Sequence, residues 1–153
     1  MKFFERYAAY APLFIRIALA AVFISHGAQK LFGGFGGYGL QETAKVFTIL
    51  GFKPGLLMAL FAGGAEFGGG LLLLAGFQTR IGGALIAVVM TVATLKIHIQ
   101  HGFFMNWSGT PGIGHGVEYT LTLLLAALSL IFSGGGKVSV DDALRSKENP
   151  SAS

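Results

Sequence analysis

The chain has 153 residues, enough for one domain, and 53% of them are hydrophobic whereas only 12% are charged. A soluble domain carries about 25% charged residues to keep its surface hydrated, so this composition excludes an ordinary soluble protein and indicates a lipid environment. The formal charge of +4 comes without a basic stripe, which excludes a nucleic-acid-binding surface, and the absence of cysteine excludes disulfides, thiolate metal sites and cysteine nucleophiles.

The first ten residues carry aromatic side chains at helical spacing, which predicts a short helix lying in the membrane interface. Four apolar stretches follow, each near the roughly 20 residues that a helix needs to cross a bilayer. They are residues 11–32, 56–77, 81–99 and 117–132. Because period-two alternation is absent and backbone groups in lipid must be bonded internally, we predict helices and not barrel strands. The expected fold is all-α: an integral membrane bundle of four transmembrane helices over residues 1–136, with short interfacial helices.

The connections between these spans differ in character. The long connection 33–55 has apolar residues at helical spacing and predicts a short amphipathic helix across the mouth of the bundle. Residues 78–80 form a tight turn, so the second and third spans are expected to be antiparallel neighbours. Residues 100–116 form a loop whose aromatic side chains suit the headgroup region. Residues 137–153 are predicted to form a polar tail.

Lysine and arginine are distributed unevenly between the two predicted sides of the membrane. The N-terminus, the 78–80 turn and the tail share one side and carry Lys2, Arg6, Arg80, Lys137, Arg145 and Lys147. The opposite side has only Lys45 and Lys53. Since basic residues are enriched in cytoplasmic segments, we expect both termini in the cytoplasm.

Ionisable residues inside the spans are the strongest functional signal in the sequence. Each costs about 2.5–3.5 kcal/mol at the centre of the membrane if unpaired, so such residues face the bundle interior and pair. Glu66 lies about 15 Å from the outer end of its helix, and most of the others lie in the outer halves of theirs. We therefore predict one outward-facing polar pocket with five candidates for ligand binding or proton relay: His26, Lys30, Glu66, His98 and Glu118.

Spacing along the helices indicates which of these groups point inward. His26 and Lys30 are i, i+4 neighbours, and Thr91, Thr94, His98 and His101 follow i, i+3, i+7 and i+10 on the third span. Three further cations are interpreted as structural charges: Arg16, Arg80 and Lys96. Of these, Lys96 lies two residues from His98 and is expected to extend toward the headgroups.

Structural and cofactor-binding interpretations stand beside the pocket hypothesis. Glu66 can neutralise Lys30 and thereby hold the helices together. The five glycines of the segment 63–70 predict close helix packing around Glu66. Histidine and carboxylate side chains can bind a metal ion, so a metal site is one alternative, with His98 and His101 as its weak candidates. No HExxH pattern supports it. Haem likewise lacks a C-x-x-C-H motif.

A series of short motifs along the chain resembles the DoxX family of small bacterial membrane proteins. The resemblance rests on Arg16, Gly27-Ala28-Gln29-Lys30-Leu31, Glu66 followed by glycines, Gly76-Phe77-Gln78-Thr79-Arg80, His98 with Gly102-Phe103-Phe104, Glu118, and Gly134-Gly135-Gly136-Lys137-Val138-Ser139-Val140-Asp141. It implies a four-helix fold in the bacterial inner membrane and, through the namesakes, a likeness to the membrane subunit of a thiosulfate:quinone oxidoreductase. One feature departs from the family, because Val140 stands where Leu is typical. The chain also has no cysteine that could carry a persulfide, which argues against sulfur chemistry.

The leading hypothesis is a pocket that binds a quinone or another small molecule in support of a membrane redox complex. A quinone that takes up electrons needs protons, and histidine and glutamate at the mouth of a membrane protein can deliver them. The expected partners are the lipid bilayer and other subunits of such a complex. Catalysis by the chain itself is left open, and the alternatives are a non-catalytic accessory or assembly subunit, or a small transporter.

Overall fold

The computed structural model describes residues 2–148, and every regular element in that range is a helix. A short helix, α1 (Lys2–Tyr7), and a 3₁₀ turn lead directly into the first membrane helix. Pro12 lies in the first turn of that helix, where its missing N–H costs no hydrogen bond. The remaining helices, in chain order, are α2 (Ala11–Phe32), α3 (Gly39–Ile49), α4 (Gly55–Ala75), α5 (Thr79–Ala93), α6 (Glu118–Ser133) and α7 (Val140–Glu148).

Three helical stretches of the described chain are long and apolar enough to cross a membrane: residues 4–32, 55–75 and 79–101. The third begins with α5 and continues as one turn of π-helix and one of 3₁₀-helix. The fourth predicted span is α6, which is apolar but has only 16 residues. At 1.5 Å per residue it covers about 24 Å. The all-α membrane fold is confirmed, with α6 as the shortest of the four predicted spans.

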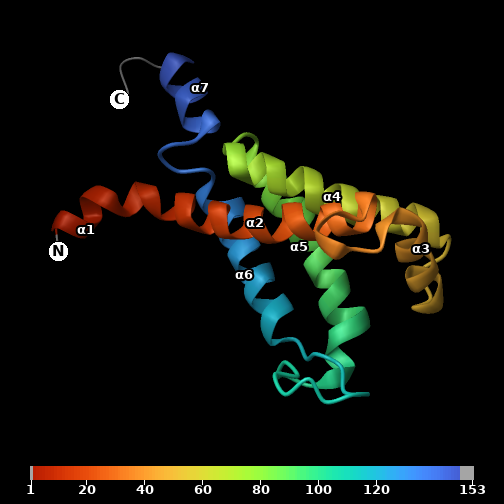
Figure 1. The fold of residues 1–153 in the computed structure, drawn as a ribbon. Coiled ribbons are helices and arrows are strands. Elements are labelled where there is room, and N and C mark those ends of the chain that lie inside the picture. Colours follow the sequence, from red (N-terminus) through yellow and green to blue (C-terminus); the bar gives the residue numbers. More distant parts are fainter. Residues whose placement is uncertain (1, 149–153) are drawn as a thin grey trace.

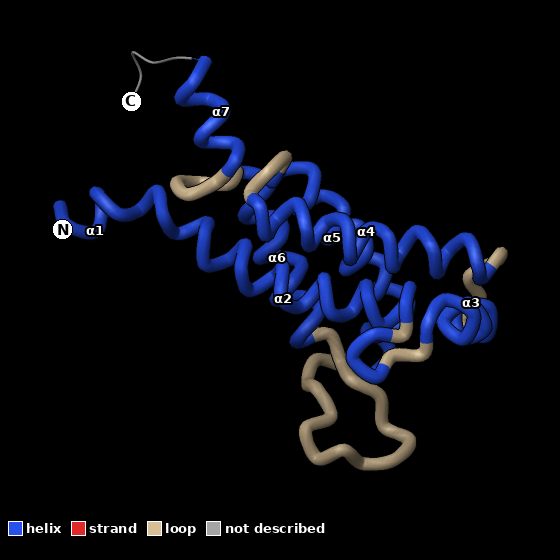
Figure 2. Tube along the Cα trace, turned by 45° about the horizontal axis from the view of Figure 1, so that its top comes forward, coloured by secondary structure: helices blue, strands red, loops and turns tan. Residues whose placement is uncertain are grey.

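The membrane helices form two antiparallel pairs. Helix α2 packs mainly on α4, whereas α5 packs on both α6 and α4. We call the end with the chain termini and the α4–α5 turn the inner end, and the end with α3 and the loop 102–117 the outer end. Figures 1 and 2 show that α3 lies apart from the outer end of α5 and this loop. The two pairs therefore meet at the inner end and diverge toward the outer end.

Glycine allows the helices to approach closely where they meet. A Cβ atom on Gly27 of α2 would lie 2.5 Å from the backbone nitrogen of Phe67 on α4. Gly69 and Gly82 bring the backbones of α4 and α5 together in the same way, and Gly63 lies against the side chain of Leu31. The close packing expected around Glu66 is thus confirmed at Gly63 and Gly69, whereas a Cβ on Gly64 or Gly68 would meet no atom within 4 Å.

Arg16 joins three segments at the inner end. Its side chain is only 1% exposed. The guanidinium donates one hydrogen bond to the carbonyl oxygen of Leu73, 3.2 Å away in the last turn of α4, and another to that of Val138, 2.8 Å away in the tail. Gly76 has a φ of 64° and no side chain, and a Cβ there would collide with the guanidinium. Arg16, predicted as a structural charge, therefore caps the end of α4 and fixes the tail to it.

The negatively charged Asp141 adds a second set of hydrogen bonds to this junction. Its two carboxylate oxygens accept hydrogen bonds from the backbone N–H groups of Gln78 (2.8 Å) and Thr79 (2.9 Å), which begin α5. A carboxylate at a helix N-terminus satisfies unpaired N–H groups and is favoured by the helix dipole. The first part of the predicted polar tail is thus bound to the bundle and continues as α7. Residues 149–153 of that tail lie outside the described residues.

This junction predicts a specific sensitivity to acid. Burial raises the pKa of Asp141, but hydrogen bonds from Thr79 and Gln78 and the positive Arg145 lower it by more, so the pKa lies below its ordinary value. The ionised carboxylate therefore stabilises the fold above about pH 4, and its contribution is lost as the pH falls through the lowered pKa. We expect Asp141→Asn to lower the free energy of unfolding near neutral pH by about 1–2 kcal/mol.

Thermal unfolding in detergent at several pH values measures this effect. The Asp141→Asn variant should lose less stability than the wild type between about pH 5 and about pH 3. Asp142→Asn is the matched control, because Asp142 forms only a part-exposed ion pair with Lys137 at 3.4 Å. An Asp141→Asn protein that loses as much stability in acid as the wild type would contradict the proposed capping role.

Candidate functional site

A cavity of about 990 Å³ lies where the two helix pairs diverge. Helices α2, α4, α5 and α6 supply its walls, which are predominantly apolar. At the outer end, Phe47 and Phe52 border it from the side of α3, and Met105 and His115 border it from the loop 102–117. Of the five predicted site residues, the structure places four in the lining of this one cavity: His26, Lys30, Glu66 and His98.

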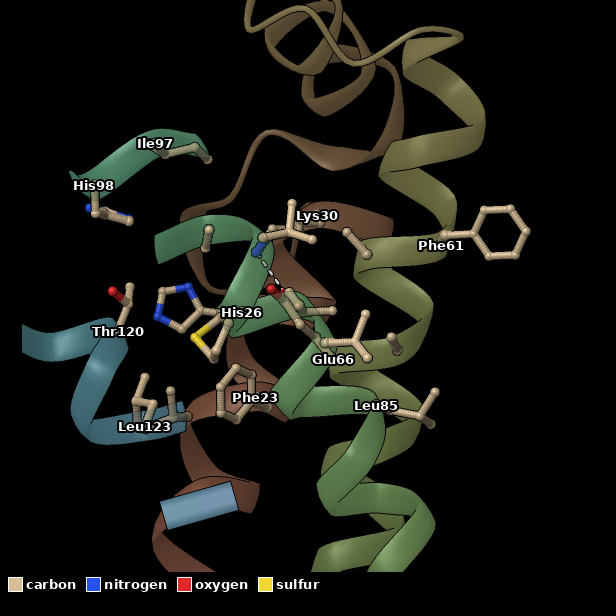
Figure 3. Close-up of a pocket in the computed structure, with 18 of the residues that line it drawn as sticks. Phe23, His26, Lys30, Phe61, Glu66, Leu85, Ile97, His98, Thr120 and Leu123 are labelled. Carbon is tan, nitrogen blue, oxygen red and sulfur yellow. Dashed lines mark hydrogen bonds and ion pairs between the residues drawn. The ribbon is translucent and has the colours of Figure 1, made fainter. Parts of the chain in front are cut away.

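Lys30 and Glu66 form an ion pair between α2 and α4. The ammonium nitrogen of Lys30 lies 2.6 Å from Oε2 of Glu66, and the glutamate side chain is 3% exposed, against 24% for the lysine. The close approach of the two helices at Gly63 brings the pair together. The pairing predicted from the sequence is confirmed, and Figure 3 shows it beside the cavity.

His26 lies one helical turn inward from Lys30 on the same face of α2. Figure 3 shows its ring between the Lys30–Glu66 pair and Thr120 on α6. Below the ring in this view the labelled side chains are apolar: Phe23, Leu85 and Leu123. The histidines and the ion pair therefore gather at the outer end of the cavity, whereas the wall toward the inner end is apolar apart from Arg80.

His98 reaches the cavity from the end of the third span and is fixed by the outer loop. Its Nδ1 lies 2.7 Å from the carbonyl oxygen of His115. Because a carbonyl can only accept, Nδ1 carries the hydrogen, and Nε2 of the neutral ring is left as an acceptor. This arrangement orients one imidazole nitrogen for a ligand or for proton uptake.

Asn106 and His115 support His98 and were missed by the sequence analysis as site residues. The backbone N–H of Asn106 donates to Nδ1 of His115 at 3.2 Å, and the Asn106 amide donates to the carbonyls of Thr110 and Ile113. These bonds close the loop on itself. The contact joins residues 17 apart through irregular backbone, where periodicity gives no signal.

A π-helix changes the face of the third span on which its polar residues lie. Residues 94–98 form this turn, and a π-helical turn contains more residues than an α-helical one. Thr94 donates to the hydroxyl of Thr120 on α6 at 2.9 Å, and His98 lines the cavity, but His101 does not. The line of inward-facing residues expected from α-helical spacing therefore ends at His98, and His101 lies outside the cavity lining. Lys96 is exposed and outside the lining, as expected.

Glu118 and Arg80 are tied to the backbone. Oε2 of Glu118 accepts the N–H of Met105 at 3.0 Å, so this carboxylate holds the outer loop and does not line the cavity. Arg80, predicted as a structural charge, donates to the carbonyl of Ile131 at 2.8 Å near the end of α6 and also lines the cavity. Within residues 2–148, no three histidine, aspartate or glutamate side chains come together in a group that could hold a metal ion.

The Lys30–Glu66 pair generates a stability prediction. Glu66→Gln leaves the lysine without its anion in a largely buried site, which we expect to lower the free energy of unfolding by about 3 kcal/mol. The double variant Glu66→Gln with Lys30→Met should recover part of this loss. Glu42→Gln is the control, because the Lys45–Glu42 pair has the same 2.6 Å separation but is exposed, and its loss should stay below about 1 kcal/mol.

Melting temperatures of the purified variants in detergent measure this order of stability. The buried pair contributes nothing if Glu66→Gln melts at the same temperature as the wild type.

Three proteins similar to this chain come from bacteria. An uncharacterized membrane protein of Mycobacterium tuberculosis is 31% identical over 133 residues, which cover 85% of this chain and 78% of that protein. An uncharacterized protein of Haemophilus influenzae is 30% identical over 142 residues, covering 93% and 96%. A Bacillus subtilis protein named "Putative oxidoreductase CatD" is 25% identical over 142 residues, covering 92% of each. No solved structure is significantly similar. Since the DoxX family profile matches residues 11–99, more than half of the chain, this protein belongs to the DoxX family of membrane proteins.

Proposed function

We propose that this protein binds a quinone in the cavity between its two helix pairs and serves a membrane redox complex. The observation that carries the proposal is the division of the cavity into two ends. Five ionisable side chains, His26, Lys30, Glu66, His98 and His115, lie at the outer end, and Arg80 lies at the inner end, whereas the wall between them is mostly apolar. A quinone has the matching chemistry, because its ring oxygens accept hydrogen bonds and the rest of the molecule is hydrophobic.

The outer end can exchange protons as well as donate hydrogen bonds. Reduction of a quinone to a hydroquinone consumes two electrons and two protons. In this proposal a partner subunit supplies the electrons, and His98 and Lys30 hold the protons near the two ring oxygens. Imidazole suits this task, because it gains and releases a proton near neutral pH. A positioned acid or base of this kind accelerates proton transfer by about 10²–10⁴-fold.

The redox part of the proposal draws support from one relative. The Bacillus subtilis protein that is similar over 92% of this chain carries the word oxidoreductase in its name. This chain has no cysteine that could pass electrons by thiol chemistry. Its contribution to a redox complex would therefore be to bind the quinone and to move protons, with electron transfer assigned to a partner.

Replacing the two histidines tests the proposal. Gln at His26 and at His98 keeps a polar side chain but cannot take up a proton, so we expect quinone-linked activity of the partner complex to fall by about 10²-fold or more. The melting temperature should change little. His101→Gln is the matched control, because this exposed histidine does not line the cavity.

Quinone affinity, activity and melting temperature are measured on the same preparations. Unchanged affinity and activity with both histidines replaced would end the proposal. A drop in melting temperature, with activity following only the amount of folded protein, would favour a second candidate function.

That second candidate is a non-catalytic accessory or assembly subunit. The ion pair between Lys30 and Glu66 favours it, because each charge already has a partner that links α2 to α4. In this function the charges only hold the helices in place for other subunits to bind. The histidine variants separate it from quinone binding.

We propose that the protein lies in the bacterial inner membrane with both termini in the cytoplasm. The proposal rests on the excess of lysine and arginine in the inner segments. It places the polar end of the cavity, and the loop 102–117, on the periplasmic side. Reporter fusions at Gly36 and after Ser153 should give periplasmic and cytoplasmic signals respectively, and the reverse pattern would overturn this orientation.

A further inference from the structure

We infer that the cavity is entered sideways from the bilayer and holds an isoprenoid chain along α5, so that its ligand is a chain-bearing quinone with an uncharged head. This inference rests on the proposed function and extends it. Quinone binding requires only the polar outer end, whereas a bound chain requires the apolar remainder and an opening toward lipid.

The apolar part of the cavity is elongated along α5. Its lining on this helix begins at Arg80 and is apolar from Ile81 to Ala93. The twelve helical steps from residue 81 to residue 93 rise by about 18 Å. Small side chains on the facing helices, Ala65 on α4 and Ala84 on α5, line this part and leave the space between them open. The shape suits a narrow apolar chain better than a compact solute.

The side of the cavity between α4 and α5 faces lipid. Phe61 on α4 and Val88 on α5 both line the cavity, yet each is 64% exposed. Leu85, also in the lining, is 37% exposed. In Figure 3, Phe61 and Leu85 lie on the side opposite His98 and Thr120. Apolar side chains exposed in a membrane span contact lipid, so a chain can pass between them without crossing water.

The charges at the polar end indicate an uncharged head. Lys30 already has Glu66 at 2.6 Å, so the polar end offers no uncompensated cation to a phosphate group. Arg80, at the opposite end of the lining, donates to the carbonyl of Ile131. The side chain of Lys96 is outside the lining. A phospholipid would bring its charged headgroup beside a buried carboxylate, which is unfavourable. A quinone ring brings two neutral acceptors, which can meet the spare N–H donors of Lys30.

The experiment compares two probes and four proteins, the wild type and three variants, in lipid nanodiscs of the same composition. The probes are ubiquinone-0, which has no side chain, and ubiquinone-2, which has two isoprene units. Ala84→Phe fills the apolar part of the cavity, and Ala18→Phe is the matched control, an exposed alanine of α2 that does not line the cavity. Each affinity is compared with that of the wild type for the same probe, so partitioning of the probe into the bilayer cancels.

We expect Ala84→Phe to weaken binding of ubiquinone-2 by about tenfold, the effect of about 1.4 kcal/mol of overpacking, and to change that of ubiquinone-0 by less than about twofold. Ala18→Phe should change neither. Ala84→Leu, a smaller insertion, should give a smaller loss of the same selectivity and guards against a folding defect in the phenylalanine variant.

Three results would overturn the inference. If Ala84→Phe affects both probes equally or neither, the quinone binds without its chain in this groove, and the proposed function stands. If mass spectrometry of the purified wild type finds a phospholipid that Ala84→Phe does not retain, lipid occupies the groove. If neither probe binds the wild type, the proposed function fails and this inference fails with it.

Discussion

The contacts of Arg16 and Asp141 at the inner end determine how the rest of the molecule is arranged. Helix ends buried in or near lipid leave backbone groups that water cannot satisfy. Arg16 satisfies the end of α4 through Leu73, and Asp141 satisfies the start of α5 through Gln78 and Thr79. Both residues also bind or belong to the tail segment. Four parts of the chain are thus fixed at one end, and the outer halves of the helix pairs can diverge.

This divergence explains why an apolar cavity can persist in a membrane protein. Between helices in lipid there is no hydrophobic force that closes a gap, because lipid chains are as apolar as the side chains they would replace. Close packing is instead concentrated where glycine permits it, as at Gly27 against Phe67 and at Gly69 against Gly82. Beyond those contacts Thr94 and Thr120 join α5 to α6. The space left between the pairs can be occupied by an apolar chain at little cost.

Much of this architecture could be predicted from the sequence, because lipid imposes strong rules on apolar length and on buried charge. The spans, the helix at 39–49 and the Lys30–Glu66 pair all follow from such rules. The role of Glu118 could not be predicted, since its partner Met105 lies in irregular backbone. The π-helical turn at 94–98 also escaped prediction, because the spacing argument assumed a constant number of residues per turn. The tail was predicted as polar from composition, which gave no sign that it caps other helices.

The charged groups at the two ends of the bundle differ in how many hydrogen-bond donors and acceptors they leave unused. At the inner end the carboxylate of Asp141 has a backbone donor at each oxygen, and each terminal nitrogen of Arg16 has a carbonyl acceptor. At the outer end, within the described chain, Lys30 gives one of its three N–H donors to Glu66, and His98 is bonded through Nδ1. Two N–H groups of the lysine and Nε2 of the imidazole therefore remain for another molecule. Both ends hold charged groups in a lipid environment, and Arg80 lines the cavity toward the inner end. The outer end combines the spare N–H groups of Lys30 with Nε2 of His98 beside the cavity, so the polar head of a ligand can bind there.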